Sequence, residues 1–246
     1  VDKDHFSILI VGLGLIGGSL AKALYGFRNS TLYAVDTDPA VIAAAEHDGV
    51  IKKGYTDISE IAPKCQLTIL CVRPTVTKKL LQTAPFRKDS LVTDVCGVKQ
   101  YLIQDTDTTC RFRYIGGHPM AGSEKSGYSN SKAMLIENAY YVLTPSVEVS
   151  DEKVARYESF VNALKALPVI LDYKKHDYVT GTISHLPHII AASLVNFVKD
   201  TDTKDELMKH LAAGGFKDIT RIASSSPTMW QNICTQNKEN ISQILG

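Results

Sequence analysis

The sequence predicts an α/β protein in which a doubly wound sheet is followed by a smaller all-helical domain. Short apolar runs of strand length alternate with helical stretches through residue 172, and this alternation is typical of a sheet that helices cover on both faces. A cluster of glycines directly follows the first run. After residue 172 no strong strand run occurs, so we expect domains at residues 1–172 and 173–246.

Each strand or helix expected in the first domain is indicated by a short sequence pattern. Runs rich in Ile, Leu and Val predict buried strands, and they occupy residues 6–11, 32–35, 67–72, 90–95, 112–115, 140–143 and 169–171. Helical stretches cover residues 39–46 and 74–81, each of which starts with proline. Residues 154–167 predict a further helix, because their apolar side chains recur at helical spacing.

The C-terminal part predicts helices only. Residues 183–198 indicate a mostly buried helix, with Pro187 either in its first turn or at a kink. Residues 206–213 predict a shorter helix that the glycines at 214–215 end, and Ser226, followed by proline, caps a third helix. So small a unit has few residues for a core of its own. We therefore expect its apolar helices to pair with a second copy in a homodimer.

Composition and charge exclude several classes of partner. The 246 residues carry 27 Lys and Arg against 26 Asp and Glu, so nothing predicts binding to nucleic acid. No apolar run reaches the roughly 18 residues of a membrane span, and residues 1–5 lack the apolar core of a signal peptide. The five cysteines are scattered and predict neither a disulfide framework nor a zinc site. We expect a cytoplasmic protein that binds a small molecule.

The glycine cluster predicts a dinucleotide site. Residues 12–17 form the GxGxxG pattern between an expected strand and an expected helix. Gly12 allows the tight turn, Gly14 lets the backbone approach a pyrophosphate, and Gly17 lets the helix pack against the sheet. The alternative is a glycine turn that binds nothing.

Neighbouring residues complete the expected cofactor site. The helix start, with Leu15 and Ile16, offers N–H groups to the phosphates. Asp36 ends the next strand and would accept hydrogen bonds from the adenine ribose, which favours NAD over NADP. Val72 ends the third strand-like run at the same sheet edge, and Arg73 follows it. Arg73 could face the phosphates or form a surface ion pair.

Several histidines are candidates for the chemistry. His118 lies in a glycine-rich segment after an expected strand. With an unperturbed pKa of about 6.5, its imidazole could take a hydroxyl proton as hydride leaves, or it is a structural loop histidine. His176, His185 and His188 have no carboxylate at the spacing of a zinc motif, so we expect a capping or core hydrogen bond for at least one of them rather than a metal site. Lys99 is interpreted as a solvated helix residue rather than a catalytic one.

Two cations follow the C-terminal glycines. Lys217 and Arg221 are four residues apart, so a helix would place both on one face. Arginine is suited to bidentate recognition of a carboxylate. The pair could bind a dicarboxylate, or it could be a solvated basic face that Asp218 partly balances.

Together these segments resemble the prephenate and arogenate dehydrogenases. The resemblance rests on GLGLIGGSL at 12–20, Asp36, TDVCGVK at 93–99, HPMAGSEKSG at 118–127, SHLPH at 184–188 and GGFKDITRIASSSPTMW at 214–230. It implies a Rossmann-type domain with NAD as cofactor and a homodimer through the helical domain. The implied reaction is oxidative decarboxylation of prephenate to 4-hydroxyphenylpyruvate, in tyrosine biosynthesis.

The resemblance also implies roles for single residues. The implied catalytic residues are His118, Ser123, Asp177 and His188, and the substrate-binding residues are His188 and Arg221, with Lys217 added because of its spacing. His118 would accept the hydroxyl proton, and Arg221 would bind a substrate carboxylate. A histidine at 188, near the substrate side chain, suits the keto acid prephenate better than the ammonium group of arogenate.

One departure and three alternatives remain. Gly97 stands where the family often has a serine, so water or Ser123 would have to supply a hydroxyl near His118. Arogenate is the alternative substrate. A 3-hydroxyacid-type dehydrogenase would need an Asn four residues after a Lys, which the lysines at 174–175 lack. A non-catalytic NAD-binding regulator is the alternative from another class, and the presence of both His118 and Arg221 argues against it.

Overall fold

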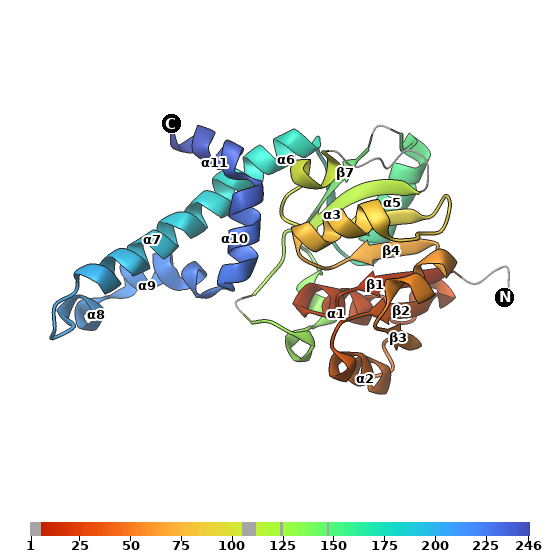
Figure 1. The fold of residues 1–246 in the computed structure, drawn as a ribbon, viewed down its shortest axis with the longest axis horizontal. Helices are drawn as coiled ribbons and strands as arrows, with labels where there is room; N and C mark the ends of the chain where they lie inside the picture. Colours follow the sequence, from red (N-terminus) through yellow and green to blue (C-terminus); the bar gives the residue numbers. More distant parts are fainter. Residues whose placement is uncertain (1–5, 105–111, 124, 147) are drawn as a thin grey trace. The chain divides into compact units, whose positions relative to one another are not determined.

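The computed structural model describes residues 6–104, 112–123, 125–146 and 148–246, in two compact units, Val1–His176 and Asp177–Gly246 (Figure 1). The first unit holds one sheet in the order β3-β2-β1-β4-β5-β6-β7-β8. Its strands are β1 (Ser7–Val11), β2 (Thr31–Val35), β3 (Lys53–Tyr55), β4 (Leu67–Leu70), β5 (Leu91–Asp94), β6 (Arg113–Pro119), β7 (Tyr140–Pro145) and β8 (Leu167–Ile170). Neighbouring strands are parallel except β6 and β7. The first six follow the order of a Rossmann-type sheet, which confirms the predicted fold class.

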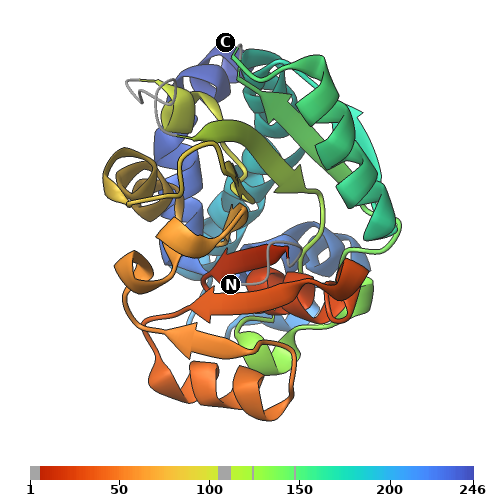
Figure 2. The same cartoon turned by 90° about the vertical axis from the view of Figure 1, so that its right-hand side faces the viewer.

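Helices cover both faces of this sheet (Figure 2). They are α1 (Leu15–Ala23), α2 (Pro39–His47), α3 (Pro74–Thr83), α4 (Gln100–Ile103) and α5 (Asp151–Ala163). Side chains alternate along each strand, so Ile8 and Ile10 of β1 join the core under α1 and α5, while Leu9 and Val11 join the core under α3 and α4. Because β1, β4, β5 and β6 are parallel, their carboxyl ends lie at one edge of the sheet. Ligands bind at this edge in such sheets.

Two elements of this unit differ from the sequence-based expectation. No apolar run predicts β3, because this short edge strand is only partly buried and contains Lys53 and Gly54. The helix expected over residues 154–167 ends earlier, at Ala163. Lys165 takes a left-handed φ of 59°, which ends the helix and turns the chain into β8.

The second unit is all helical, as predicted. Its helices are α7 (Leu186–Thr201), α8 (Leu207–Leu211), α9 (Gly214–Thr220), α10 (Pro227–Gln236) and α11 (Lys238–Leu245), while α6 (Tyr173–Thr180) crosses the boundary between the units. The π-helical turn Gly181–His185 joins α6 to α7. Pro187 lies in the first turn of α7. Because proline has no N–H for the helical ladder, the wider π turn before it relieves the mismatch.

Short connections complete the chain. The 3-10 turns are Phe27–Asn29, Ile58–Glu60, Ala62–Lys64, Tyr128–Asn130, Ala133–Leu135 and Arg221–Ser224. The two glycines expected to end a helix instead begin α9, since α8 already ends at Leu211. Ser226 caps α10 as predicted, and its Oγ accepts the N–H of Met229 at 3.4 Å.

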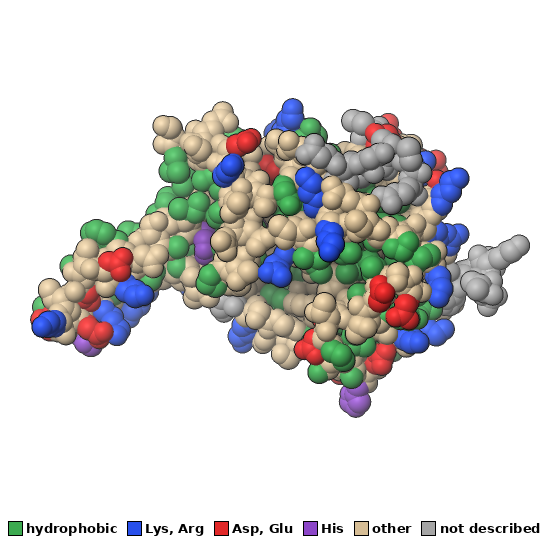
Figure 3. All heavy atoms as spheres, in the orientation of Figure 1, with side chains coloured by type: hydrophobic (Ala, Val, Ile, Leu, Met, Phe, Trp, Pro, Cys, Tyr) green, Lys and Arg blue, Asp and Glu red, His purple; other side chains and the backbone are tan. Residues whose placement is uncertain are grey.

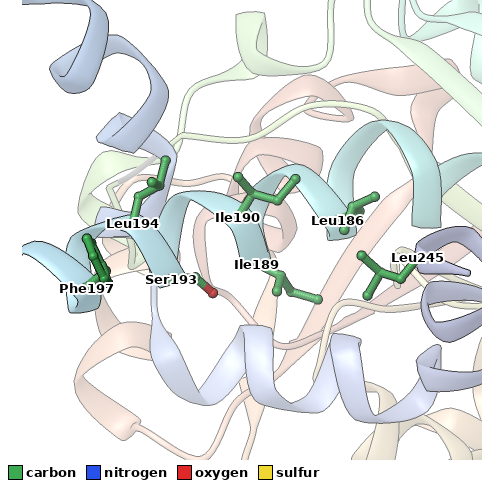
Figure 4. A pocket seen from close by; sticks show the side chains of 7 residues that line it. All are labelled: Leu186, Ile189, Ile190, Ser193, Leu194, Phe197 and Leu245. Carbon is green, nitrogen blue, oxygen red and sulfur yellow. The ribbon is translucent and has the colours of Figure 1, made fainter.

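Helix α7 carries an apolar face at the surface of the second unit. Leu186, Ile189, Ile190, Ser193, Leu194 and Phe197 line a hollow with Leu245 of α11 (Figure 4), and green hydrophobic atoms are visible on this unit in the space-filling view (Figure 3). Among the described residues, the continuous helix Tyr173–Thr201 alone is long and apolar enough to cross a membrane, and 22% of its most apolar window is buried. A helix that packs on protein gives the same signal, so no membrane assignment follows.

Candidate functional site

A tight glycine turn follows β1, as predicted. Gly12 takes a left-handed φ of 93° and donates its N–H to the carbonyl of Val35 at 2.7 Å. A Cβ on Gly17 would come within 1.8 Å of the Gly12 carbonyl oxygen, so α1 packs directly on the turn. Gly14 is the N-cap of α1 and has open space where a Cβ would point, with no side chain capping the helix. This start of α1 can therefore bind an anion.

The residues predicted to surround the turn lie beside it. Leu15 and Ile16 form the first turn of α1. Asp36 follows β2, and its carboxylate accepts the N–H of Leu13 at 2.7 Å and that of Asp38 at 3.0 Å. These two bonds fix the carboxylate next to the glycine turn.

Val72 and Arg73 occupy the loop after β4. A Cβ on Gly12 would lie 2.9 Å from Cγ1 of Val72, so Val72 packs on the glycine turn. The Val72 carbonyl accepts the Thr77 hydroxyl at 3.1 Å, which holds the loop against α3. Arg73 is exposed and forms no ion pair with another described residue.

A buried ion pair supports this sheet edge. Asp94, the last residue of β5, and Lys99 are both fully buried, and Lys99 Nζ lies 2.5 Å from Asp94 Oδ2. The interpretation of Lys99 as a solvated helix residue is wrong. Helix α4 begins only after it, and its side chain points inward to the carboxylate and to the Cys96 carbonyl at 2.7 Å.

Asp94 also ties β5 to the strand beside it. Its carboxylate accepts the Cys96 N–H at 2.8 Å, the Tyr114 hydroxyl at 2.7 Å and the Gly117 N–H at 3.2 Å. Gly117 directly precedes His118 in β6. Burial raises the pKa of the Cys96 thiol to about 12, so this thiol stays protonated and unreactive.

His118 lies near the carboxyl end of β6 and is half-buried. Its Nδ1 is 2.9 Å from Nε2 of His176, and the two rings meet edge to face at 70°. His176 is fully buried. Ser123 is exposed, and its hydroxyl accepts the N–H of Lys125 at 3.0 Å within the loop.

An aromatic cluster lies in the second unit. His188 stacks on Trp230 of α10, with ring centroids 3.7 Å apart and planes 6° apart. His185 meets the same indole edge to face, and its Nδ1 lies 3.0 Å from Nδ2 of Asn237. His176 and His185 both form hydrogen bonds, as predicted for at least one of the three histidines.

Two polar atoms of this cluster are unsatisfied. His188 Nδ1 and Trp230 Nε1 are buried and have no hydrogen-bond partner among the described residues. Burial lowers the pKa of His188, although a backbone hydrogen bond with Ile222 acts the other way. Because an unmade buried hydrogen bond costs about 1–3 kcal/mol, a polar group of a ligand would be stabilised here.

The remaining predicted residues also belong to the second unit. Asp177 is fully buried, and its backbone carbonyl accepts the Asn237 amide at 2.8 Å. Lys217 of α9 and Arg221, which begins the next 3-10 turn, are exposed. Neither cation forms an ion pair within the described ranges, so both are available to an anionic ligand.

Sequence reasoning missed two parts of this arrangement. Asp94 has a sequence signal, a carboxylate at the end of a buried strand, but the sequence around Lys99 predicts a surface residue. The contact of His176 with His118 has no signal in the sequence, because only the fold brings α6 to β6. Within the described part of the chain, no group of three or more His, Cys, Asp or Glu could hold a metal ion. Four cysteines there are free thiols, and Cys110 lies outside the described residues.

Comparison with known proteins assigns the chain to a family. Residues 20–170 match the nucleotide-binding domain of prephenate dehydrogenase, and residues 172–246 match its dimerization domain. The chain belongs to the prephenate dehydrogenase family. The resemblance seen in the sequence is thereby confirmed.

Individual prephenate dehydrogenases show how far the likeness extends. The Bacillus subtilis (strain 168) enzyme is 38% identical over 243 residues, 96% of this chain and 65% of the relative. The crystal structure of the A. aeolicus prephenate dehydrogenase with hydroxyphenyl propionate and NAD+ has a TM-score of 0.90 at 33% identity, covering 100% of this chain and 87% of that one. Synechocystis arogenate dehydrogenase has a TM-score of 0.77 at 28% identity, covering 98% and 87%. The chain thus spans 65% of the length of its B. subtilis relative.

Proposed function

We propose that this chain catalyses the oxidative decarboxylation of prephenate with NAD. Prephenate and NAD+ would give 4-hydroxyphenylpyruvate, carbon dioxide and NADH. Family membership supports the proposal, as do relatives named prephenate dehydrogenase. The observation that carries it is the position of His118, a half-buried histidine at the same sheet edge as the glycine turn.

The glycine turn fits NAD. The open space at Gly14 admits a pyrophosphate to the start of α1, and Asp36 stands where the adenine ribose would hydrogen-bond. The Asp36 carboxylate would repel a 2′-phosphate, so NAD is preferred to NADP. When bound, NAD accepts the hydride from the ring carbon that carries the hydroxyl group.

His118 moves the proton. Its Nδ1 faces His176, so Nε2 is the nitrogen that receives the substrate hydroxyl proton as hydride leaves. Loss of the ring carboxylate as carbon dioxide then makes the ring aromatic. Asp177 would order the second unit through Asn237, and Ser123 would offer a hydroxyl from the loop that follows His118.

The substrate is a dicarboxylate, and the second unit offers cations for it. Arg221 would bind one carboxylate, with Lys217 beside it and His188 near the keto-acid side chain. The unsatisfied Nδ1 of His188 supports this placement, since a polar substrate group would give it a partner.

Replacing Arg221 should weaken substrate binding. We expect Arg221→Ala to raise the KM for prephenate by about 10- to 100-fold, the effect of losing one hydrogen bond to a charged group, with a smaller change in kcat. Initial rates of NADH formation measure both constants. Lys204→Ala, another exposed cation of the second unit, is the matched control. Equal KM values for Arg221→Ala and the control would remove Arg221 from the site.

The glycine turn can be tested with two alanine substitutions. Gly17→Ala forces a Cβ against the Gly12 carbonyl, so we expect about 1–3 kcal/mol less unfolding free energy and weaker NAD binding. Gly14→Ala meets open space in the protein and should weaken NAD binding alone. Urea unfolding and calorimetric titration with NAD separate the two effects. Unchanged NAD affinity in Gly14→Ala would contradict the assignment of the turn.

The activity assay decides the proposed function. The purified protein is mixed with NAD and prephenate, and NADH absorbance is followed, with arogenate and NADP in parallel. Turnover of prephenate with NAD is the expected result. Turnover of arogenate alone would keep the family and change the substrate. NAD binding without turnover of either substrate would favour the regulator alternative.

We also propose a cytoplasmic homodimer formed through the apolar face of α7. Exposed Ile190 and Phe197 on this face, beside Leu245, would be covered by a second copy. The match of residues 172–246 to a dimerization domain supports this arrangement. Light scattering should give twice the chain mass. A monomer at micromolar concentration, or protein found only in the membrane fraction of cells, would contradict it.

A further inference from the structure

The contact between His118 and His176 has the geometry of a hydrogen bond. The Nδ1 to Nε2 distance is 2.9 Å, within the range of a normal hydrogen bond. The partner is held firmly: His176 is fully buried, and its backbone N–H donates to the Asp172 carbonyl at 2.8 Å. Asp172 in turn caps the start of α6 by accepting the N–H groups of Lys174 and Lys175. The position of His176 is therefore set by the helix start.

The reaction proposed for His118 requires one form of its ring, and this bond is compatible with that form. A hydrogen bond between two imidazole nitrogens needs one N–H and one lone pair. A neutral His118 that accepts a proton at Nε2 must carry its own hydrogen at Nδ1, and that N–H then points at the lone pair of His176 Nε2. We propose that His176 is the positioning residue of the catalytic base: it holds His118 in the tautomer and orientation that present Nε2 to the substrate hydroxyl. This inference rests on the proposed function of His118.

Three other residues in the segments expected at this sheet edge differ in what their side chains do. Gly97 has none, and the Ser123 hydroxyl accepts the N–H of Lys125. The Asp94 carboxylate, close to the backbone of β6, accepts four hydrogen bonds from other groups. An imidazole partner is neutral, so His118 receives orientation from it without the full charge stabilisation that a carboxylate partner would add.

Two substitutions of His176 test whether it positions His118 or only stabilises the fold. His176→Leu removes the acceptor, whereas His176→Gln can place an amide oxygen at the reach of Nε2. We expect His176→Leu to lower kcat by about 10- to 100-fold with KM values for prephenate and NAD changed less than about twofold. His176→Gln should recover most of that loss. Tyr157→Phe, which deletes a buried hydrogen bond to Thr93 in the same unit, controls for lost stability and should keep kcat.

A spectroscopic readout is independent of turnover. In protein labelled with ¹⁵N-histidine, the wild type and His176→Gln should show His118 protonated at Nδ1, while His176→Leu should show a mixture of tautomers. Equal kcat in His176→Leu and the wild type, or an unchanged His118 tautomer in that variant, would overturn the proposal. If the wild type turns over neither prephenate nor arogenate, the proposed function fails, and the tautomer measurement still decides whether His176 orients His118.

Discussion

His118→Asn is expected to lower kcat for prephenate oxidation by about 10²- to 10⁴-fold, the usual contribution of a positioned general base. Asparagine can keep a donor toward His176 but offers no nitrogen that takes a proton near neutral pH. The glycine turn and Asp36 remain intact, so NAD affinity should not change. Rates of NADH formation and calorimetric titration with NAD measure the two quantities.

A matched control removes a histidine that has no part in the chemistry. The side chain of His47, at the end of α2, is 92% exposed, and His47→Asn should leave kcat unchanged. A loss of kcat below about fivefold in His118→Asn would mean that another group, or water, accepts the proton. Loss of NAD binding in that variant would mean that the substitution disturbs the sheet edge instead.

Asp94→Asn is expected to cost about 3–5 kcal/mol of unfolding free energy. The substitution leaves the Lys99 ammonium fully buried without its counter-charge, and breaking a buried ion pair at one partner has a cost of this size. Asparagine keeps the volume of the side chain, so a cavity cannot explain the loss. Urea unfolding followed by circular dichroism measures the change.

The double variant shows whether the buried charge is the cause. Asp94→Asn combined with Lys99→Met removes both charges and should be more stable than Asp94→Asn alone. Glu152→Gln breaks the exposed pair with Arg156, whose side chains are 73% and 77% exposed, and should have little effect. If Asp94→Asn proves as mild as Glu152→Gln, Lys99 is hydrated or re-paired in the variant.

The features that the sequence predicts correctly are those in which a short local motif is required by the backbone geometry. The glycine turn is such a case, because Gly12 needs a left-handed φ and Gly17 needs the absence of a Cβ. The ion pair of Asp94 with Lys99 is the opposite case. A lysine five residues after a strand end has the composition of a surface loop, and only the sheet register and the inward path of the loop show that it is buried.

The second unit was harder to predict in detail. Its helices are short, and the two glycines at 214–215 are compatible with either a helix end or a helix start. The helix continues through Pro187 because a π turn precedes it. The sequence carries no recognised signal for that π turn. The roles of His188 and Arg221 rest on the family resemblance and remain predictions.

The pairing of β6 with its neighbouring strands limits how easily the backbone around His118 can move. This strand is paired on one side with β5 and on the other with β7, where His118 lies opposite Val142. Residues 113–115 pair with β5 and residues 115–119 pair with β7, so freeing His118 requires the β7 ladder to open. Opening a hydrogen-bonded strand inside a sheet costs more free energy than opening an exposed turn. Arg221 lies in a short exposed turn that can open locally at far lower cost. Local opening is therefore expected to displace Arg221, the proposed carboxylate ligand, more often than His118, the proposed proton acceptor.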